Sequence, residues 1–450
     1  MESSTLSNFR LTTLPGSATL RLLVLGSLCL LMLVPLSVVR DVVKERRALR
    51  AEAIESIAAG WGGEQTLLGP ALVLRFRCEG PDAEGSLRHW RETAVVLPES
   101  LETTGRARTE RRSRGLHEIP VYSAAMRVRG EFAAVAWSEL PIDCSAPQLD
   151  QAELALAVSD PRGIARLSDL DWRGTPVAWR SGNSLGDCWS TGVSAALESD
   201  SAQSELASVS RFEFEIELRG IDRIAFAPLG RSTQVTLTSD WPTPSFDGAF
   251  LPADRATRSD GSEATWRVSS LSRPFPQAWQ VGTAPDLGKW TFGVRWFVVA
   301  DSYLMTDRSL KYGFLFVALT LMLFFLFELA GDARLHPVQY TLVGGAVCVF
   351  YLLLLSFSEG RGFGPAYFVA SAATTLQIAL YARAILGARR RALVLAGALA
   401  TLYGGLYALI GAEELALLLG SVLLFAALAL LMWKTRSVDW SRKRGVAEAS

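Results

Sequence analysis

The sequence predicts an α-helical integral membrane protein with a large all-β domain inserted between its first and second membrane helices. Half of the 450 residues are apolar, and the longest apolar runs form six blocks of 18 to 20 residues. Each block is close to the roughly 20 residues that a helix needs to cross a bilayer. The 272 residues between the first two blocks carry short β-like runs instead. The six predicted spans are residues 22–39, 312–331, 338–357, 363–381, 392–411 and 415–433.

The distribution of Arg and Lys predicts the orientation of these spans. The tails 1–21 and 434–450, together with the loops 332–337 and 382–391, contain twelve basic residues, whereas the short loops on the other side contain Arg361 alone. The positive-inside rule therefore places both termini in the cytoplasm and the inserted domain, 61–311, in the periplasm, or outside the membrane of a one-membrane cell. A basic cluster within 40–50 argues the other way, but long domains translocate largely regardless of charge.

The first block is interpreted as an uncleaved anchor, because its apolar run is long and no small-residue cleavage site follows it. Residues 40–60 continue as an amphipathic helix, with Val43, Ile54 and Ile57 at helical spacing. We expect this helix to form a stalk. Its basic face is either a solvated surface laced with glutamates or a contact to anionic lipid head groups.

Residues 61–311 predict an extracytoplasmic β-rich domain, sandwich-like or two-lobed. The stretch RFEFEIELRG (211–220) alternates, so that Phe212, Phe214, Ile216 and Leu218 point to one side and charged residues to the other. ELALAVSDPRGIARL and FEFEIELRGIDRIAF resemble each other, which suggests two related lobes. A serine-rich stretch, 194–210, is expected to be a loop. The predicted strands are 71–77, 93–97, 126–137, 153–158, 212–219, 233–238, 264–271 and 290–299.

The sequence gives little support for catalysis. Ser184 lies in a G-x-S-x-G pattern, which in α/β-hydrolases is followed by an acid and then a histidine. His89 and His117 precede Ser184, and His336 is predicted to lie across the membrane. The triad order cannot be met, so a glycine-rich surface turn is the favoured interpretation and no catalytic residue is assigned.

Other ligand chemistry is equally sparse. The chain has no His-Glu-x-x-His, no Cys-x-x-Cys and no phosphate-binding glycine loop, so we expect no metal and no cofactor. The formal net charge of zero disfavours nucleic acid as a partner. Eleven of the thirteen tryptophans fall in the inserted domain, where a β core explains them better than carbohydrate stacking does.

Three of the five cysteines, Cys78, Cys144 and Cys188, lie in the inserted domain, in a compartment that can oxidise thiols. At most one pair can form among them, and the sequence leaves open whether any does. We favour Cys144 with Cys188, because both have turn-like surroundings whereas Cys78 follows a strand. Cys29 and Cys348 lie in predicted spans and are expected to stay thiols.

Within the predicted bundle, Ala396, Ala400 and Gly404 recur at every fourth position and are expected to let another helix approach closely. Gln377 is the strongly polar residue deepest in a span. The ionisable residues Glu328, Glu359, Arg361 and Arg383 lie near predicted span ends, where they are interpreted as interface anchors rather than as a transport path.

Several stretches resemble the CreD family of bacterial inner-membrane proteins, which is associated with cell envelope integrity. The resemblance covers about 22–440 and is most specific over 314–367; the Arg361-Gly362 turn departs from it. The stretches that carry it are Trp61-Gly62-Gly63 with Gln65-Thr66 and Gly69-Pro70, SFDGAFLP, FGVRWF, DRSLKYGFLFVALT, LHPVQYTLVGG and YLLLLSFSEGRGFGPAY.

This resemblance implies a role in envelope integrity, including tolerance to stress or to some colicins, and a link to a two-component response. It implies no reaction and no catalytic residue. We therefore expect a membrane-bound binding or scaffolding protein whose partners are membrane lipid and either an envelope protein or peptidoglycan. A transporter, or a transporter subunit, and a periplasmic envelope-modifying enzyme are the alternatives.

Overall fold

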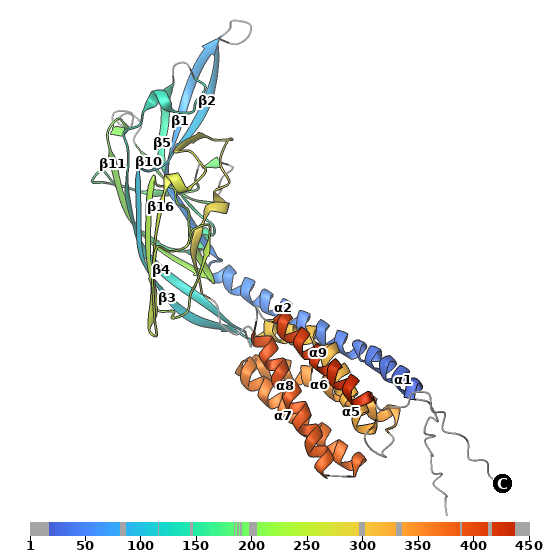
Figure 1. Cartoon of the computed structure of the whole chain (residues 1–450). Helices are drawn as coiled ribbons and strands as arrows, with labels where there is room; N and C mark the ends of the chain where they lie inside the picture. The colour runs from blue at the N-terminus through green and yellow to red at the C-terminus, as the bar shows by residue number, and fades with distance from the viewer. Residues whose placement is uncertain are drawn as a thin grey trace, which may run out of the picture. The chain divides into compact units, whose positions relative to one another are not determined.

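The computed structural model describes residues 18–81, 87–115, 117–144, 147–183, 185–186, 189, 191–197, 205–296, 302–329, 335–387, 389–412 and 416–436. Its contacts divide the chain into two compact units, shown in Figure 1. One consists of Met1–Leu49 with Val299–Ser450, and its described elements are helices. The other, Arg50–Val298, consists mainly of strands. The chain thus combines several apolar helices with a large all-β domain, as the sequence predicts.

Four described helices are long and apolar enough to cross a membrane, or five if the bent pair α4 and α5 counts as one span. This pair bends by 53°. The first candidate span continues from α1 into α2, so the predicted anchor and stalk form one helical stretch of 41 residues, Arg21–Trp61. The helices are α1 (Ala18–Leu31), α2 (Leu33–Trp61), α4 (Ser302–Lys311), α5 (Gly313–Leu329), α6 (Pro337–Arg361), α7 (Phe363–Leu386), α8 (Arg389–Gly411) and α9 (Ala416–Thr435).

Helix α4 lies within the stretch predicted as the end of the β-rich domain. Its Tyr303 and Leu310 are buried in the core of the helical unit. That core also contains Phe350 of α6, whose ring centroid lies 4.8 Å from that of Tyr403 on α8 and 5.5 Å from that of Tyr367 on α7. Aromatic packing of this kind joins helices that the sequence could only place one after another.

The expected contact face of α8 was wrong within the described residues. Ala400 and Gly404 are exposed, and a Cβ atom at Gly404 would meet nothing within 4 Å. Leu395, Leu399 and Tyr403 pack into the core instead. The face of α8 that packs against the other helices carries its large apolar side chains, because these bury more surface than Ala or Gly does.

The β unit contains two nine-stranded sheets. The β1 sheet consists of β1 (Gln65–Pro81), β2 (Leu87–Val96), β5 (Gln148–Val158), β9 (Trp179–Ser181), β10 (Gly192–Leu197), β12 (Arg223–Phe226), β14 (Ser245–Gly248), β17 (Ala278–Gln280) and β18 (Phe292–Arg295). The β4 sheet consists of β3 (Ser100–Arg114), β4 (His117–Phe132), β6 (Ile164–Leu167), β7 (Leu170–Trp172), β8 (Thr175–Val177), β11 (Ser210–Ile221), β13 (Ser232–Ser239), β15 (Asp254–Arg258) and β16 (Gly261–Ser269).

One hydrophobic core joins the two sheets, which makes the unit sandwich-like rather than two separate lobes. Leu72 and Leu154 of the β1 sheet belong to the same buried cluster as Phe214 and Trp266 of the β4 sheet. The alternation predicted for β11 is confirmed: Phe212, Phe214, Ile216 and Leu218 are each at most 2% exposed. Antiparallel pairing with β4 fixes its register, with Phe214 opposite Val128.

The two similar stretches of sequence are crossovers between the sheets. The first runs from β5 of the β1 sheet through the 3₁₀ turn η2 (Pro161–Gly163) into β6, which pairs with β11. The second runs the opposite way, from β11 into β12, which pairs with β1. Asp222 makes the second turn with a positive φ of 58°. The resemblance therefore reflects two matching connections within one sandwich.

Two strands occur where the sequence predicted none. The serine-rich stretch 194–210, predicted as a loop, includes the last four residues of β10, where Ala195 is fully buried and pairs with Leu154 of β5; residues 198–204 lie outside the described ones. Strand β3 was not predicted, because its sequence SLETTGRARTERRSR is almost entirely polar. Backbone pairing with both β4 and β13 holds it in the β4 sheet. Propensity is a weak guide where neighbouring strands supply the hydrogen bonds.

Candidate functional site

The candidate catalytic and ligand residues of the sequence lie in separate elements. Ser184 and Cys188 lie outside the described residues. His89 lies on β2 and pairs with the exposed Glu79, 3.2 Å away. His117 begins β4, and His336 caps the start of α6. No group of three or more His, Cys, Asp or Glu side chains that could hold a metal ion occurs in the part of the chain that the structure describes.

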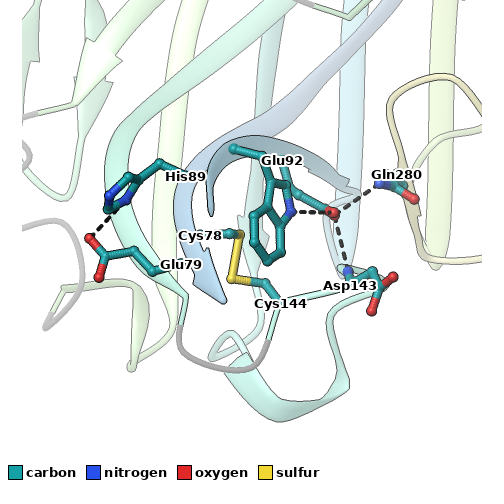
Figure 2. The surroundings of a disulfide bond; sticks show 8 residues. Cys78, Glu79, His89, Glu92, Asp143, Cys144 and Gln280 are labelled. Atoms are coloured by element: carbon teal, nitrogen blue, oxygen red, sulfur yellow. Dashed lines mark hydrogen bonds and ion pairs between the residues drawn. A yellow bond between two sulfur atoms is a disulfide. The ribbon is translucent and has the colours of Figure 1, made fainter. Parts of the chain in front are cut away.

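A disulfide joins Cys78 to Cys144, which overturns the expected pairing of Cys144 with Cys188. Figure 2 shows the bond at the end of β1. The chain leaves β4, turns through the 3₁₀ segment η1 (Trp137–Glu139) and returns past β1. The two Cα atoms are 5.6 Å apart, a normal separation for a disulfide. Cys29 and Cys348 are free and buried, as expected.

A buried carboxylate organises the same region. Glu92 is 8% exposed and accepts hydrogen bonds from Trp90 Nε1, the Asp143 backbone and Gln280 Nε2, at 2.9 to 3.1 Å. These donors come from β2, the loop that carries Cys144, and β17 (Figure 2). A buried charge needs such partners. Because its three bonds join three segments, we interpret Glu92 as a structural group.

The residues of the Trp61-Gly62-Gly63 motif form the link between α2 and the two crossovers. Gln65 is fully buried and donates to the carbonyls of Asp160 and Arg219, both at 3.1 Å. Gly62 has a φ of +115°, and a Cβ there would lie 2.7 Å from the Arg219 carbonyl. The Gly63 N–H donates to the Asp160 carboxylate at 2.9 Å. These motif residues therefore have structural roles.

A cluster of charged side chains lies next to this link. Arg295 forms ion pairs with Asp222, Glu64 and Asp247, and Arg223 also pairs with Asp247 at 3.0 Å. Burial raises the pKa of Asp222, and the nearby Arg295 opposes that effect. The donors and acceptors satisfy one another, so this cluster also stabilises the fold rather than offering a ligand site.

The best candidate for a binding site is the polar face, defined here as the outward side chains of β3, β4, β11 and β13. It is the side of the β4 sheet opposite the apolar residues of β11. A hollow of about 890 Å³ lies there, lined among others by Glu102, Arg129, Glu131, Arg211 and Gln234. A cavity of this size falls in the range of small-molecule and peptide sites, although such sites are usually more apolar.

Opposite charges alternate across the polar face. Arg129 makes a bidentate contact with Glu102 at 2.9 to 3.0 Å, and Arg127 pairs with Glu213 and Glu215 at 3.4 and 2.9 Å. All of these side chains are at least a third exposed. Exposed pairs contribute little stability, roughly 0 to 1 kcal/mol each. They can therefore exchange for a ligand's charges at small cost.

Two further arginines have no partner among the described residues: Arg106, on this face, and Arg166, on the neighbouring β6. Arg106 and Arg166 line a second hollow, of about 370 Å³, together with Arg127 and Glu215. Both guanidinium groups are exposed. Planar guanidinium groups bind carboxylate and phosphate with two parallel hydrogen bonds. The polar face can thus bind an anionic group beside its balanced charge pairs.

Two acidic residues of the helical unit, Glu328 and Glu359, have partners on other helices. Glu328 accepts from Arg21 at 2.8 Å and from the Tyr340 hydroxyl at 2.6 Å. Glu359 accepts from the Tyr303 hydroxyl at 3.0 Å and lies 3.7 Å from Arg46. Gln377 is exposed. Glu328 and Glu359 thus link helices within this unit.

Fold and site together define a protein class: several apolar helices of membrane-spanning length joined to a large β-sandwich with a hollowed polar face. The family model for "Inner membrane protein CreD" matches residues 17–441. Inner membrane protein CreD of Escherichia coli (strain K12) is 33% identical over 421 residues, which cover 91% of each chain. The chain belongs to the CreD family.

Proposed function

We propose that this chain is a multi-pass inner-membrane protein whose termini are cytoplasmic and whose β unit is periplasmic. Three observations support the proposal. The chain has candidate membrane spans, and its matching family is described as an inner membrane protein. The tails and short loops assigned to the cytoplasm contain twelve basic residues, whereas the short loops assigned to the other side contain one. A disulfide in the β unit also suits an oxidising compartment.

In this arrangement the protein supports envelope integrity, such as tolerance to stress or colicins, by binding rather than by catalysis. The hollow of about 890 Å³ in the polar face carries this proposal, because most of its lining residues offer hydrogen-bond donors or acceptors. Its proposed ligand is a polar component of the envelope that contains carboxylates, either peptidoglycan or an envelope protein. The helices hold the β unit near that ligand.

In-cell photo-crosslinking tests the binding face. A photoreactive amino acid at Gln234, in the hollow, should capture a discrete partner, whereas the same group at Arg91, exposed on β2 of the other sheet, should not. A product that collapses on muramidase treatment would identify peptidoglycan, and a peptide fingerprint would identify a protein. Equal labelling from both positions would contradict the proposed face.

Complementation of a deletion strain tests the role. Arg127→Gln with Arg129→Gln should reduce tolerance to detergent at normal protein level, while Arg267→Gln, on β16, should not, although it also removes an exposed ion pair. Ser184→Ala is expected to retain full function. Loss of tolerance with Ser184→Ala alone would favour the envelope-modifying enzyme instead.

A further inference from the structure

Two carboxylates face each other at the edge of the polar face. Glu213 on β11 and Asp171 on β7 are directly opposite in the antiparallel pairing of these strands. Both side chains point outward, because their neighbours Phe212 and Trp172 are buried on the inner side of the sheet. Side chains in such positions have Cβ atoms about 5 Å apart, and like charges there destabilise a sheet. A cation bound between the two carboxylates relieves this repulsion.

The chain itself supplies little positive charge to these carboxylates. Arg127 lies 3.4 Å from Glu213, but it also pairs with Glu215 at 2.9 Å. Asp171 accepts a hydrogen bond from the Gly174 backbone at 2.7 Å and has no ion pair with another described residue. We call Glu213 and Asp171 the acidic pair. Both line the hollow of about 890 Å³, so a ligand in the hollow can reach them.

An exposed arginine lies beside the acidic pair. Arg211 is two residues before Glu213 on β11, so both side chains point to the same side and their Cα atoms are about 7 Å apart. The Arg211 side chain is 84% exposed, and its ion pair with Glu131 is long, at 3.7 Å. A guanidinium group held this loosely can bind a ligand carboxylate with two hydrogen bonds. The hollow thus places a site for a cation next to a site for an anion.

The separation of these two sites matches a short stretch of peptide. Two residues of extended chain cover about 7 Å, and the side chain of a diamino acid reaches about as far from its carboxylate. A metal ion fits less well, because Ca²⁺ takes about six to eight oxygen ligands and the arginine repels it. The occupant that satisfies both sites therefore carries an amine and a carboxylate a short distance apart.

The rest of the lining favours a small peptide over a sugar chain or a protein surface. Leu101 and Phe212 are buried in the core, which leaves Val209 as the one exposed apolar side chain among the described lining residues. Sugar rings commonly stack on exposed aromatic rings, and protein interfaces are anchored by aromatic and apolar side chains. The described lining offers neither kind of anchor, but it is rich in charged, hydroxyl and amide groups.

We propose that the hollow binds the peptide stems of peptidoglycan, which carry free carboxylates and the amine of a diamino acid. The acidic pair binds the ammonium group, and Arg211 binds a carboxylate. The proposal rests on the proposed function and names the ligand of the same site. A cross-link between stems converts the amine of one stem and a carboxylate of the other into an amide. The hollow therefore favours stems that are not cross-linked, because only these retain both charges.

Fluorescence anisotropy with the full chain in detergent micelles tests this ligand. The probe is the tetrapeptide L-Ala-γ-D-Glu-L-Lys-D-Ala, with the dye on its N-terminal nitrogen, the end that joins the sugar strand in peptidoglycan. Acetylation of the lysine amine should weaken binding at least tenfold, because it removes the positive charge. Asp171→Asn with Glu213→Gln should weaken binding of the unmodified probe by a similar factor, and Asn retains an oxygen that can accept from Gly174.

Combining the two changes makes the test specific. Once the acidic pair is neutral, acetylation of the probe should weaken binding no further, since both changes remove the same contact. Asp254→Asn with Glu263→Gln removes two exposed carboxylates on β15 and β16 and is the matched control, which should leave binding unchanged. Additive losses from the acidic-pair variant and the acetylated probe would overturn the proposal.

The anion site has its own test. Arg211→Gln should weaken binding of the tetrapeptide several-fold, because it removes the guanidinium group that takes a carboxylate. Amidation of both carboxylates of the probe should have a similar effect, and the two changes together should not be additive. Full binding of the amidated probe would overturn the assignment of Arg211.

Two further outcomes separate this proposal from the proposed function. If the tetrapeptide does not bind while a photoreactive group at Gln234 still captures a partner in cells, the peptide ligand is wrong and the polar face remains a binding site. Competition by chitotriose, a sugar chain without peptide, at the same concentration as the tetrapeptide would also overturn the peptide ligand. Absence of both binding and capture would reject the proposed function as well.

Discussion

The disulfide between Cys78 and Cys144 fastens the loop after η1 to the end of β1, beside the buried carboxylate of Glu92. The bond closes a loop with a sequence separation of 66. A cross-link of this length stabilises a fold by about 4 kcal/mol in the chain-entropy model, because it restricts the unfolded chain.

Cys78→Ser should therefore lower the free energy of unfolding of the β unit by roughly 2 to 5 kcal/mol. Cys188→Ser is the matched control and should change it little. Urea unfolding of the full chain, followed by tryptophan fluorescence, measures both. Mass mapping of the non-reduced protein should find the Cys78–Cys144 peptide; a Cys188 cross-link at normal yield would contradict the pairing.

Asp160 links η2 to the Gly63 backbone. The Arg162 guanidinium beside it lowers the pKa of the Asp160 carboxyl, with further help from the N–H groups of Gly63 and Arg162, although partial burial opposes the effect. A depressed folded-state pKa means that this carboxylate stabilises the fold above its unfolded pKa, near 3.9. The contribution is lost as pH falls through the lower, folded value.

Asp160→Asn should accordingly destabilise the protein at pH 7 by about 1 to 2 kcal/mol, and the difference from the wild type should shrink as pH falls below about 4. The same urea experiment, repeated at pH 7 and pH 3.5, checks this. Glu213→Gln, at an outward position of β11, serves as the control. An equal difference at both pH values would show that hydrogen bonding, and not charge, is what Asp160 supplies.

Strand β11 separates the core from the polar face within one element. Phe214 is 2% exposed and its ring centroid lies 5.2 Å from that of Trp179, while its neighbour Glu213 faces outward. The inward residues of β11 therefore stabilise the fold, and its outward residues belong to the proposed binding face.

Phe214→Ala should destabilise the protein by about 3 to 5 kcal/mol through lost burial and a cavity. Glu213→Ala should change stability by less than about 0.5 kcal/mol, because exposed ion pairs contribute little. Thermal unfolding of the two variants side by side tests the assignment. A similar loss in both would mean that the ion pairs of the polar face stabilise the sheet.

The orientation of the whole chain can be checked with thiol reagents. Cysteine introduced at Gly261, in the β unit, should react with an impermeant reagent added outside the inner membrane, because the short loops predict cytoplasmic termini. Cysteine at Ala388, in the basic loop between the fourth and fifth predicted spans, should react only after permeabilisation. The reverse pattern would overturn the proposed topology.

Much of this architecture follows from local sequence. A run of about 20 apolar residues fits a span whatever surrounds it, and the strict alternation of β11 assigns its inner face without knowledge of its neighbours. The Trp61-Gly62-Gly63 motif likewise indicated the family, and the structure explains it by the close approach of Gly62 to Arg219. The candidate polar face was visible only in part, as the charged residues of β11.

What remained depended on partners that are distant in sequence. Cys78 meets Cys144 because the chain returns past β1, and polar β3 becomes a strand because β4 and β13 supply its hydrogen bonds. Gly404 is exposed because larger side chains take the inner face of α8. Which segments are apolar or alternating can be read from the amino-acid order alone, since those patterns are local. Which segments pair is a property of the folded chain, because pairing depends on the free energy of contacts made across the whole fold.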